Sequence, residues 1–167
     1  MNDEHSPAHR AARLNRYAAG ADAVEAALDG ITDAELDARP GPDSWSAREI
    51  VHHLADSEMT SAIRLRKLVA EDDAVIHGYD EGLFARRLHY GERPIDASLQ
   101  AMRASRLSSA DLLGHLTVDE WHRAGTHTES GRYSVETWLQ VYGDHPHDHA
   151  RQIRDARSSA VRGDSGN

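Results

Sequence analysis

Three histidines, His145, His147 and His149, fall within five positions near the end of the sequence. On a helix, His145 and His149 lie one turn apart on the same face, which is the spacing that two imidazoles need to share one metal ion. His147 points roughly the opposite way, so we do not expect it to join them. The chain has 12 histidines, and a pair at this spacing is common by chance. Spacing alone therefore favours a surface pair without a function.

A third ligand has to come from another part of the chain. The segment 52–58 offers His52 and His53, and helical geometry alone leaves the choice between them open. Three neutral imidazoles and one or more waters would make an open site of the kind that catalytic zinc and nickel require. The other histidines have no partner at ligand spacing, and we expect them to be solvated or hydrogen-bonded structurally: His5, His9, His77, His89, His115, His122 and His127.

Long helices are predicted to position these side chains. Apolar residues recur at helical spacing over residues 8–28, 47–70 and 96–116, and again after Ser134. Ser46-Ala47-Arg48-Glu49 is a capping box that begins the second of these helices. Pro146 lies inside the last helix, where it removes one backbone hydrogen bond and predicts a local kink.

The connections between the long helices are unequal. The residues 39–42 (Arg-Pro-Gly-Pro) are a loop, and a short helical turn is expected at 34–37. Short helices are expected at 81–88 and after a second capping box at 117–120, and residues 125–133 predict a loop or small hairpin. The simplest architecture is an all-α bundle. We expect one domain over residues 8–158, with disordered termini at 1–7 and 159–167.

Composition excludes several classes of function. The formal charge is −9, with 19 Lys and Arg against 28 Asp and Glu, whereas nucleic acids and anionic membranes require a basic face. The chain has no cysteine, which excludes disulfides, thiolate metal sites and cysteine nucleophiles. Because no stretch approaches the roughly 20 apolar residues of a membrane span and no signal-peptide core is visible, we expect a cytoplasmic protein.

Five motifs in order give the chain a family resemblance. They are residues 45–58 (Trp-Ser-Ala-Arg-Glu-Ile-Val-His-His-Leu-Ala-Asp-Ser-Glu), the arginine-bearing segment 62–67, Tyr79-Asp80-Glu81, residues 94–99 (Pro-Ile-Asp-Ala-Ser-Leu), and Tyr142, His145, His149 and Ile153 in the last helix. Together they resemble the DinB superfamily over about residues 34–154. The most similar branch is that of metal-dependent hydrolases and bacillithiol S-transferases. The resemblance implies a DinB-like four-helix bundle with an extra short helix.

The resemblance also implies a ligand set. The family takes one histidine from its second helix and the pair from its last helix, and these positions fall on His53, His145 and His149. His53 is preferred to His52 because the family's ligand directly precedes an aliphatic residue, here Leu54. The sequence departs from the family at Asp144 and Pro146, and Gln152 stands where the most similar branch has a histidine.

Two classes of function remain open. The first is an enzyme in which a divalent metal, zinc or nickel, acts as a Lewis acid on a small molecule, either for hydrolysis or for transfer of a thiol such as bacillithiol or mycothiol. The second is a non-catalytic metal- or ligand-binding bundle involved in stress response. No catalytic residue can be identified, because Asp56, Glu58 and Asp148 are candidates for a general base only by their proximity in sequence. The resemblance further implies a homodimer.

Overall fold

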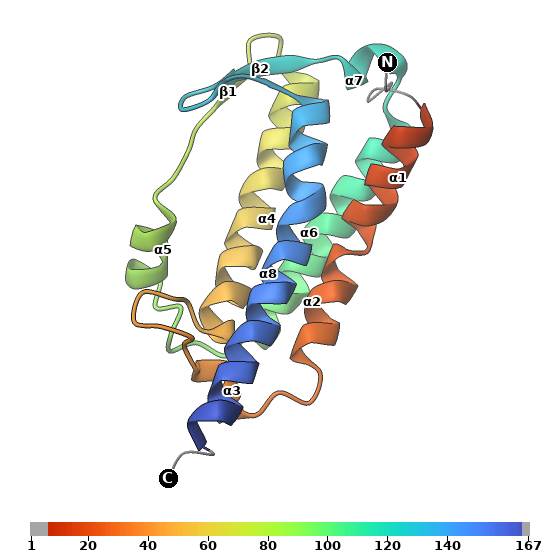
Figure 1. Ribbon diagram of the computed structural model, residues 1–167. Coiled ribbons are helices and arrows are strands. Elements are labelled where there is room, and N and C mark those ends of the chain that lie inside the picture. Colours follow the sequence, from red (N-terminus) through yellow and green to blue (C-terminus); the bar gives the residue numbers. More distant parts are fainter. Residues whose placement is uncertain (1–6, 165–167) are drawn as a thin grey trace.

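The computed structural model describes residues 7–164 and has four rods of helix (Figure 1). Helices α1 (Pro7–Ala18) and α2 (Gly20–Leu28) stack end to end as the first rod. Helices α4 (Ala47–Ala70), α6 (Asp96–His115) and α8 (Val135–Asp164) form the other three. Figure 1 shows α4 and α8 side by side and running in opposite directions, which brings residues far apart in sequence into contact.

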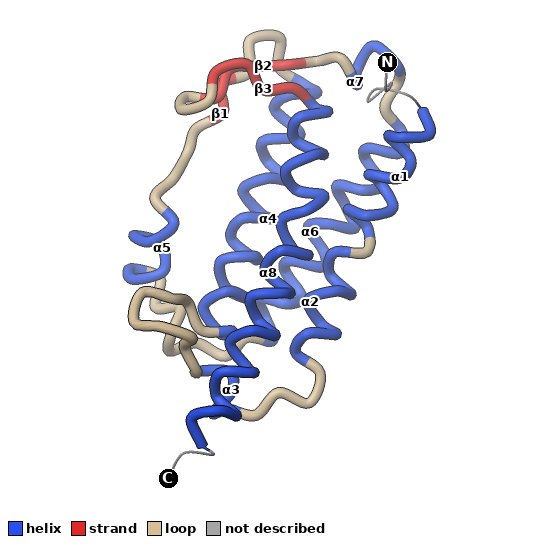
Figure 2. The backbone as a smooth tube through the Cα atoms, in the orientation of Figure 1, coloured by secondary structure: helices blue, strands red, loops and turns tan. Residues whose placement is uncertain are grey.

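Short elements close the two ends of the bundle. Helices α3 (Asp33–Asp37), α5 (Glu81–Arg87) and α7 (Val118–Trp121) lie in the connections. Strands β1 (Val75–Ile76), β2 (Ala124–His127) and β3 (Gly131–Ser134) form a small sheet in the order β1-β2-β3 at one end (Figure 2). Strands β2 and β3 are the hairpin expected at 125–133, and β1 pairs with β2 in parallel. Gly125 is required there, because a Cβ would lie 2.2 Å from the carbonyl oxygen of Ala74.

The predicted helix starts are confirmed by their caps. The Ser46 side chain accepts a hydrogen bond from the Glu49 backbone N–H, and the Glu49 carboxylate accepts one from the Ser46 backbone. Thr117 and Glu120 form the same reciprocal pair before α7. Each box satisfies amide groups that the first helical turn would otherwise leave without partners.

The expected single helix over 8–28 is wrong, because the helix is interrupted between Ala18 and Gly20. At Gly20 the rod comes very close to its neighbours. A Cβ there would lie 2.4 Å from Pro146 Cγ and 2.7 Å from Arg106 Nη2. The interruption thus falls where the first rod lies close to Arg106 of α6 and Pro146 of α8.

Helix α8 continues through Pro146 to Asp164. Proline has no amide hydrogen, so the carbonyl of Tyr142 loses its helical partner. The side chain of Arg106 replaces it, with Nη2 donating to that carbonyl at 3.1 Å. Residue 7 and residues 159–164, which the sequence predicted to be disordered, are helical, and residues 1–6 and 165–167 lie outside the described residues. The prediction of disordered termini stays a prediction.

Two apolar clusters fill the bundle, one around Val24, Leu54 and Ile153 and the other around Leu65, Leu68 and Trp138. A fully buried ion pair between Glu58 of α4 and Arg106 of α6 also crosses the bundle. None of the helices in the described part of the chain is long and apolar enough to cross a bilayer.

Candidate metal centre

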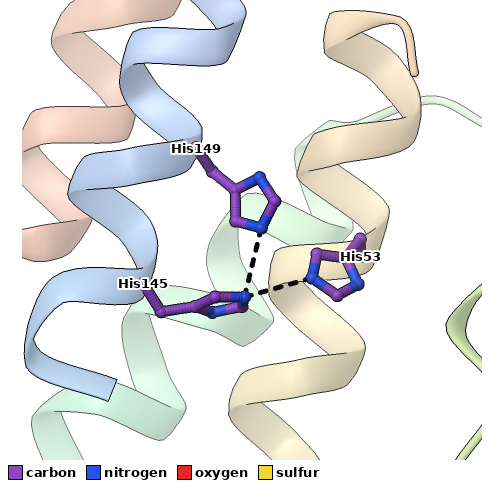
Figure 3. A group of neighbouring side chains, drawn as sticks. All are labelled: His53, His145 and His149. Carbon is purple, nitrogen blue, oxygen red and sulfur yellow. Dashed lines mark hydrogen bonds between the residues drawn. The ribbon is translucent and has the colours of Figure 1, made fainter. Parts of the chain in front are cut away.

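His53 of α4 meets His145 and His149 of α8 at the contact between these two helices (Figure 3). His145 Nε2 lies 3.2 Å from His53 Nε2 and 3.1 Å from His149 Nε2. Two zinc–nitrogen bonds of about 2.0–2.1 Å place their nitrogens about 3 Å apart. The three Nε2 atoms are therefore spaced as the ligands of one divalent ion.

The packing of the two helices fixes this convergence. His53 is buried beside Leu54, and Ala150 and Ile153 on α8 are buried in the same apolar cluster. The i, i+4 spacing predicted for His145 and His149 places both rings on the face of α8 that meets α4. The apolar cluster that α4 and α8 share therefore determines how His53 approaches His145 and His149.

The electrostatics of the site favour neutral imidazoles. Burial, with the nearby imidazoles adding to it, lowers the pKa of His53 and of His145 to about 3 each. Burial also lowers the pKa of His149, against the opposing effects of Gln152 and Asp148. A neutral imidazole is the form that binds a metal, and three nitrogen lone pairs directed at one point are stabilised by a cation between them.

Gln152 determines which ring nitrogen of His149 carries the proton. His149 Nδ1 lies 2.9 Å from Gln152 Oε1, and a carboxamide oxygen only accepts hydrogen bonds. Nδ1 therefore carries the proton, and Nε2 presents its lone pair to the site. The sequence marked Gln152 as a departure from the family, but its position three residues after His149 was the signal that could have suggested this contact.

The adjacent histidines His52 and His53 have different surroundings. His52 Nδ1 lies 2.7 Å from Ser98 Oγ, and its Nε2 lies 3.1 Å from the carbonyl oxygen of Arg93. Both of its nitrogens are therefore occupied on the α6 side of the helix. His53 turns instead toward α8, and the indole of Trp45 packs against its edge with ring centroids 4.9 Å apart.

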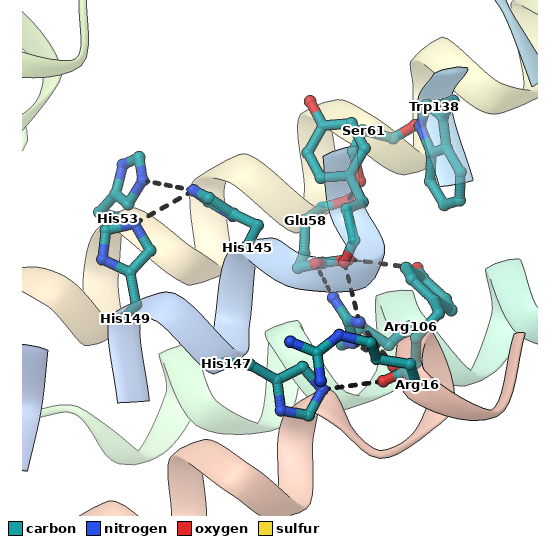
Figure 4. Close-up of polar contacts among 11 residues, drawn as sticks. Arg16, His53, Glu58, Ser61, Arg106, Trp138, His145, His147 and His149 are labelled. Atoms are coloured by element: carbon teal, nitrogen blue, oxygen red, sulfur yellow. Dashed lines mark hydrogen bonds and ion pairs between the residues drawn. The ribbon is translucent and has the colours of Figure 1, made fainter. Parts of the chain in front are cut away.

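His147 is directed away from the triad, as its spacing predicted (Figure 4). Its Nε2 hydrogen-bonds to the carbonyl of Arg16 at 2.9 Å, on the α1 side of α8. Asp144, another departure from the family, forms an ion pair with the side chain of Arg16. Within residues 7–164, no second group of three His, Asp or Glu side chains converges in the manner of the triad.

The three carboxylates considered as general bases are all engaged elsewhere. Asp56 accepts a hydrogen bond from Tyr90. Glu58 pairs with Arg106 and accepts a hydrogen bond from the Tyr17 hydroxyl (Figure 4). Asp148 pairs with Arg151. Among the described residues, no ion pair joins a carboxylate to the triad, although the charge of Asp148 acts on His145 and His149.

An open cleft of about 460 Å³ lies beside the centre. Its wall includes Trp45, which packs on His53, and Gln152, which binds His149. The remaining lining residues come from the loop before α4, from α4 itself and from α8: Pro40, Asp43, Ser44, Ile50 and Asp155.

A helical bundle with this arrangement of histidines belongs to a known class. Residues 16–153 match the DinB superfamily, and the chain is a member of that superfamily, as its motifs predicted. YfiT from Bacillus subtilis, described as "a probable metal-dependent hydrolase with an unusual four-helix bundle topology", superimposes with a TM-score of 0.86 over 100% of this chain and 94% of its own, at 24% identity. This likeness confirms the predicted four-helix bundle.

Several sequence relatives carry the name "Putative metal-dependent hydrolase". The relative from Oceanobacillus iheyensis is 32% identical over 123 residues, which cover 74% of this chain and 71% of the relative. The relative from Halalkalibacterium halodurans is 28% identical over 126 residues, covering 75% of this chain and 73% of the relative.

Proposed function

We propose that this protein is a metal-dependent enzyme that acts on a small molecule, with a divalent ion held by His53, His145 and His149. The observation that carries the proposal is the convergence of three Nε2 atoms, 3.1 and 3.2 Å apart, from two packed helices. No fourth side chain joins them in the described part of the chain. A site with three protein ligands keeps a position for water or substrate, whereas structural zinc sites are closed by a fourth ligand. The names of the relatives support the same class of function.

When bound, the ion supplies Lewis-acid chemistry, polarising a carbonyl or lowering the pKa of a water or thiol. Residues around the triad orient and cover the three proposed ligands. Gln152 keeps the proton of His149 on Nδ1, which leaves Nε2 free to bind. Trp45 covers the edge of His53, and the ring of Tyr142 approaches His145 edge-on at 6.1 Å. These rings limit the access of water to the ligands.

A specific observation favours a thiol as the activated group. Hydrolysis usually uses a general base beside the metal, and Asp56, Glu58 and Asp148 each bind another side chain instead. A thiol, with a pKa of about 8.5, loses its proton far more readily than water. Since the chain has no cysteine, the thiol has to come from a substrate. We therefore propose S-transfer from a low-molecular-weight thiol of the bacillithiol or mycothiol type, in the cytoplasm, with hydrolysis as the competing reaction.

Metal analysis tests the site directly. The wild-type protein and His147→Ala are expected to bind one equivalent of zinc or nickel, and His149→Ala is expected to lose it. His147→Ala is the matched control, since it removes an imidazole from the same turn of α8 that faces away from the triad. Unchanged metal content in His149→Ala would contradict the ligand assignment.

Activity assays then separate the reactions. The metal-loaded protein is given bacillithiol or mycothiol with an alkylating electrophile, and in parallel a set of simple ester and amide substrates. Metal-dependent S-conjugation supports the transferase, and metal-dependent hydrolysis supports the hydrolase. A metal-loaded protein inactive in both assays would favour the non-catalytic binding bundle. Light scattering on the same sample tests the proposed homodimer against the 18.5 kDa mass of one chain.

A further inference from the structure

A row of polar side chains leads away from the metal centre between α4 and α8. On α4, Ser57 is one turn after His53, and Arg64 is three turns after it on the same face. On α8, Tyr142 is one turn before His145. Because the two helices run in opposite directions, the residues after His53 on α4 and those before His145 on α8 lie on the same side of the triad. They meet where Arg64 Nη1 donates a hydrogen bond to Tyr142 Oη at 2.8 Å.

Arg64 has no carboxylate partner among the described residues. Its two hydrogen-bond acceptors, the Tyr142 hydroxyl and the His77 carbonyl, are both neutral. Its Nε is buried and makes no hydrogen bond to any described residue. The carboxylate of Glu81 is influenced by the charge of Arg64 but forms no ion pair with it. A partly buried guanidinium that forms no ion pair is unusual in a chain with nine excess negative charges.

Tyr79 adds a second buried polar group at the same place, with the Ser57 side chain near its hydroxyl. The guanidinium of Arg64 lies over its ring, 5.8 Å from the centroid. The Tyr79 hydroxyl is buried near Ser57 but makes no hydrogen bond of normal geometry to a described residue. Burial raises the pKa of Tyr79 to about 12, so the hydroxyl keeps its hydrogen at neutral pH. Buried polar groups normally have a partner, and here that partner would have to be an acceptor.

We propose that Arg64, Tyr79 and Tyr142 form an anion-binding subsite that takes the carboxylate of a substrate whose reactive group lies at the metal centre. The subsite offers one positive charge and hydroxyl donors, which suits a monoanion. The nearby Glu81 opposes a group of higher charge. The inference rests on the proposed metal-dependent function, and it adds that the substrate is a small carboxylic acid with its reactive group several bonds from the carboxylate.

Mercapto acids of increasing chain length test the subsite, each compared with the mercapto alcohol of the same length. The zinc-loaded protein is titrated by calorimetry, and the thiol provides a common metal-binding end. At the chain length that spans the two sites, the acid is expected to bind at least about tenfold more tightly than the alcohol. In Arg64→Gln this preference is expected to disappear while binding of the alcohol is unchanged.

Arg66→Gln is the matched control. Arg66 lies two residues further along α4 and binds Ser108 of α6, away from the row, so this variant should keep the preference for acids. Tyr79→Phe removes a single oxygen and is expected to weaken acid binding several-fold without loss of folding. Equal binding of acid and alcohol at every length, or a preference that persists in Arg64→Gln, would overturn the proposal.

A second measurement separates this inference from the metal assignment. In the metal-free protein, butyrate but not butyramide is expected to shift the Arg64 Nε–H resonance in a nitrogen-15 NMR titration. If metal analysis shows no bound metal, the proposed function fails, yet this titration still decides whether the subsite binds carboxylates. If metal binds and butyrate causes no shift, the subsite fails and the metal centre stands.

Discussion

Gln152 fixes the tautomer of His149, one of the proposed metal ligands, and a substitution tests this contact directly. Gln152→Leu keeps the approximate shape of the side chain but removes the oxygen that accepts the Nδ1 hydrogen. Partners of this kind are worth about 10–100-fold in metal affinity, so we expect zinc affinity to fall by that factor. A competition titration with a chromophoric chelator measures it. Arg154→Gln, an exposed change on the same helix, is the control, and equal affinities in Gln152→Leu and wild type would contradict the role.

At the level of residues, helical spacing was enough to place two histidines of the last helix on one face. It could not show which way each of two adjacent histidines on another helix points. The His145 and His149 pair follows from helical periodicity. The choice of His53 over His52 does not, because both side chains are buried on the same helix. What separates them is Ser98 and the carbonyl of Arg93, which occupy His52 from α6 and the loop before it. These neighbours are more than 40 positions away, so helical spacing could not reveal them, and the preference for His53 came from the family motif alone.

The helix contacts around Arg106 show how α1, α4, α6 and α8 depend on one buried cation. Arg106 pairs with Glu58 and also donates to the carbonyls of Tyr17 and Tyr142. Burial raises the pKa of Glu58, which the charge of Arg106 opposes. Arg106→Met leaves the carboxylate buried without its partner, and removing one member of such a pair costs about 3–5 kcal/mol. Urea unfolding should show this loss, and Arg106→Met combined with Glu58→Gln should recover part of it. A loss below about 1 kcal/mol would show that the pair is unimportant.

The close packing of Gly20, next to the break between α1 and α2, gives a second test at the level of helices. Gly20→Ala places a Cβ against Pro146 and Arg106, and overpacking of this kind costs about 1–3 kcal/mol. The control is Gly114→Ala in α6, where a Cβ would meet no atom within 4 Å. Alanine there is expected to stabilise by about 0.5–1 kcal/mol, as helix propensity dictates. Thermal unfolding of both variants measures the difference, and a stabilised Gly20→Ala would contradict the close approach.

The same position explains why sequence predicted one helix where there are two. Apolar spacing continues from Leu14 through Tyr17 to Ala21 and Val24 without a break, and a single glycine is a weak signal. The close approach at Gly20 involves Pro146 and Arg106, which are far away in the chain. Capping boxes, in contrast, depend on four consecutive residues, and the starts of α4 and α7 were predicted correctly.

At the scale of the whole molecule, the bundle and the β2–β3 hairpin were predictable, and the pairing of β1 with β2 was not. Four long amphipathic segments and the ordered DinB motifs define the fold before any coordinates are known. The strands have only two to four residues each, too short for a period of two to be visible. The parallel pairing of β1 with β2 joins residues 51 positions apart, such as Val75 and Thr126. Only the structure could therefore show that β1 joins the hairpin to complete a three-stranded sheet.

Because the triad joins α4 to α8, metal binding is expected to stabilise the entire fold. An ion that binds the folded but not the unfolded chain adds about 2.7 kcal/mol when its concentration is 100 times its dissociation constant. Adding zinc should therefore raise the melting temperature of metal-free protein, and a chelator should reverse the effect. His149→Ala should show no response to zinc, while His147→Ala should respond as the wild type does. An equal rise in His149→Ala would mean that zinc stabilises the protein from a site other than this one.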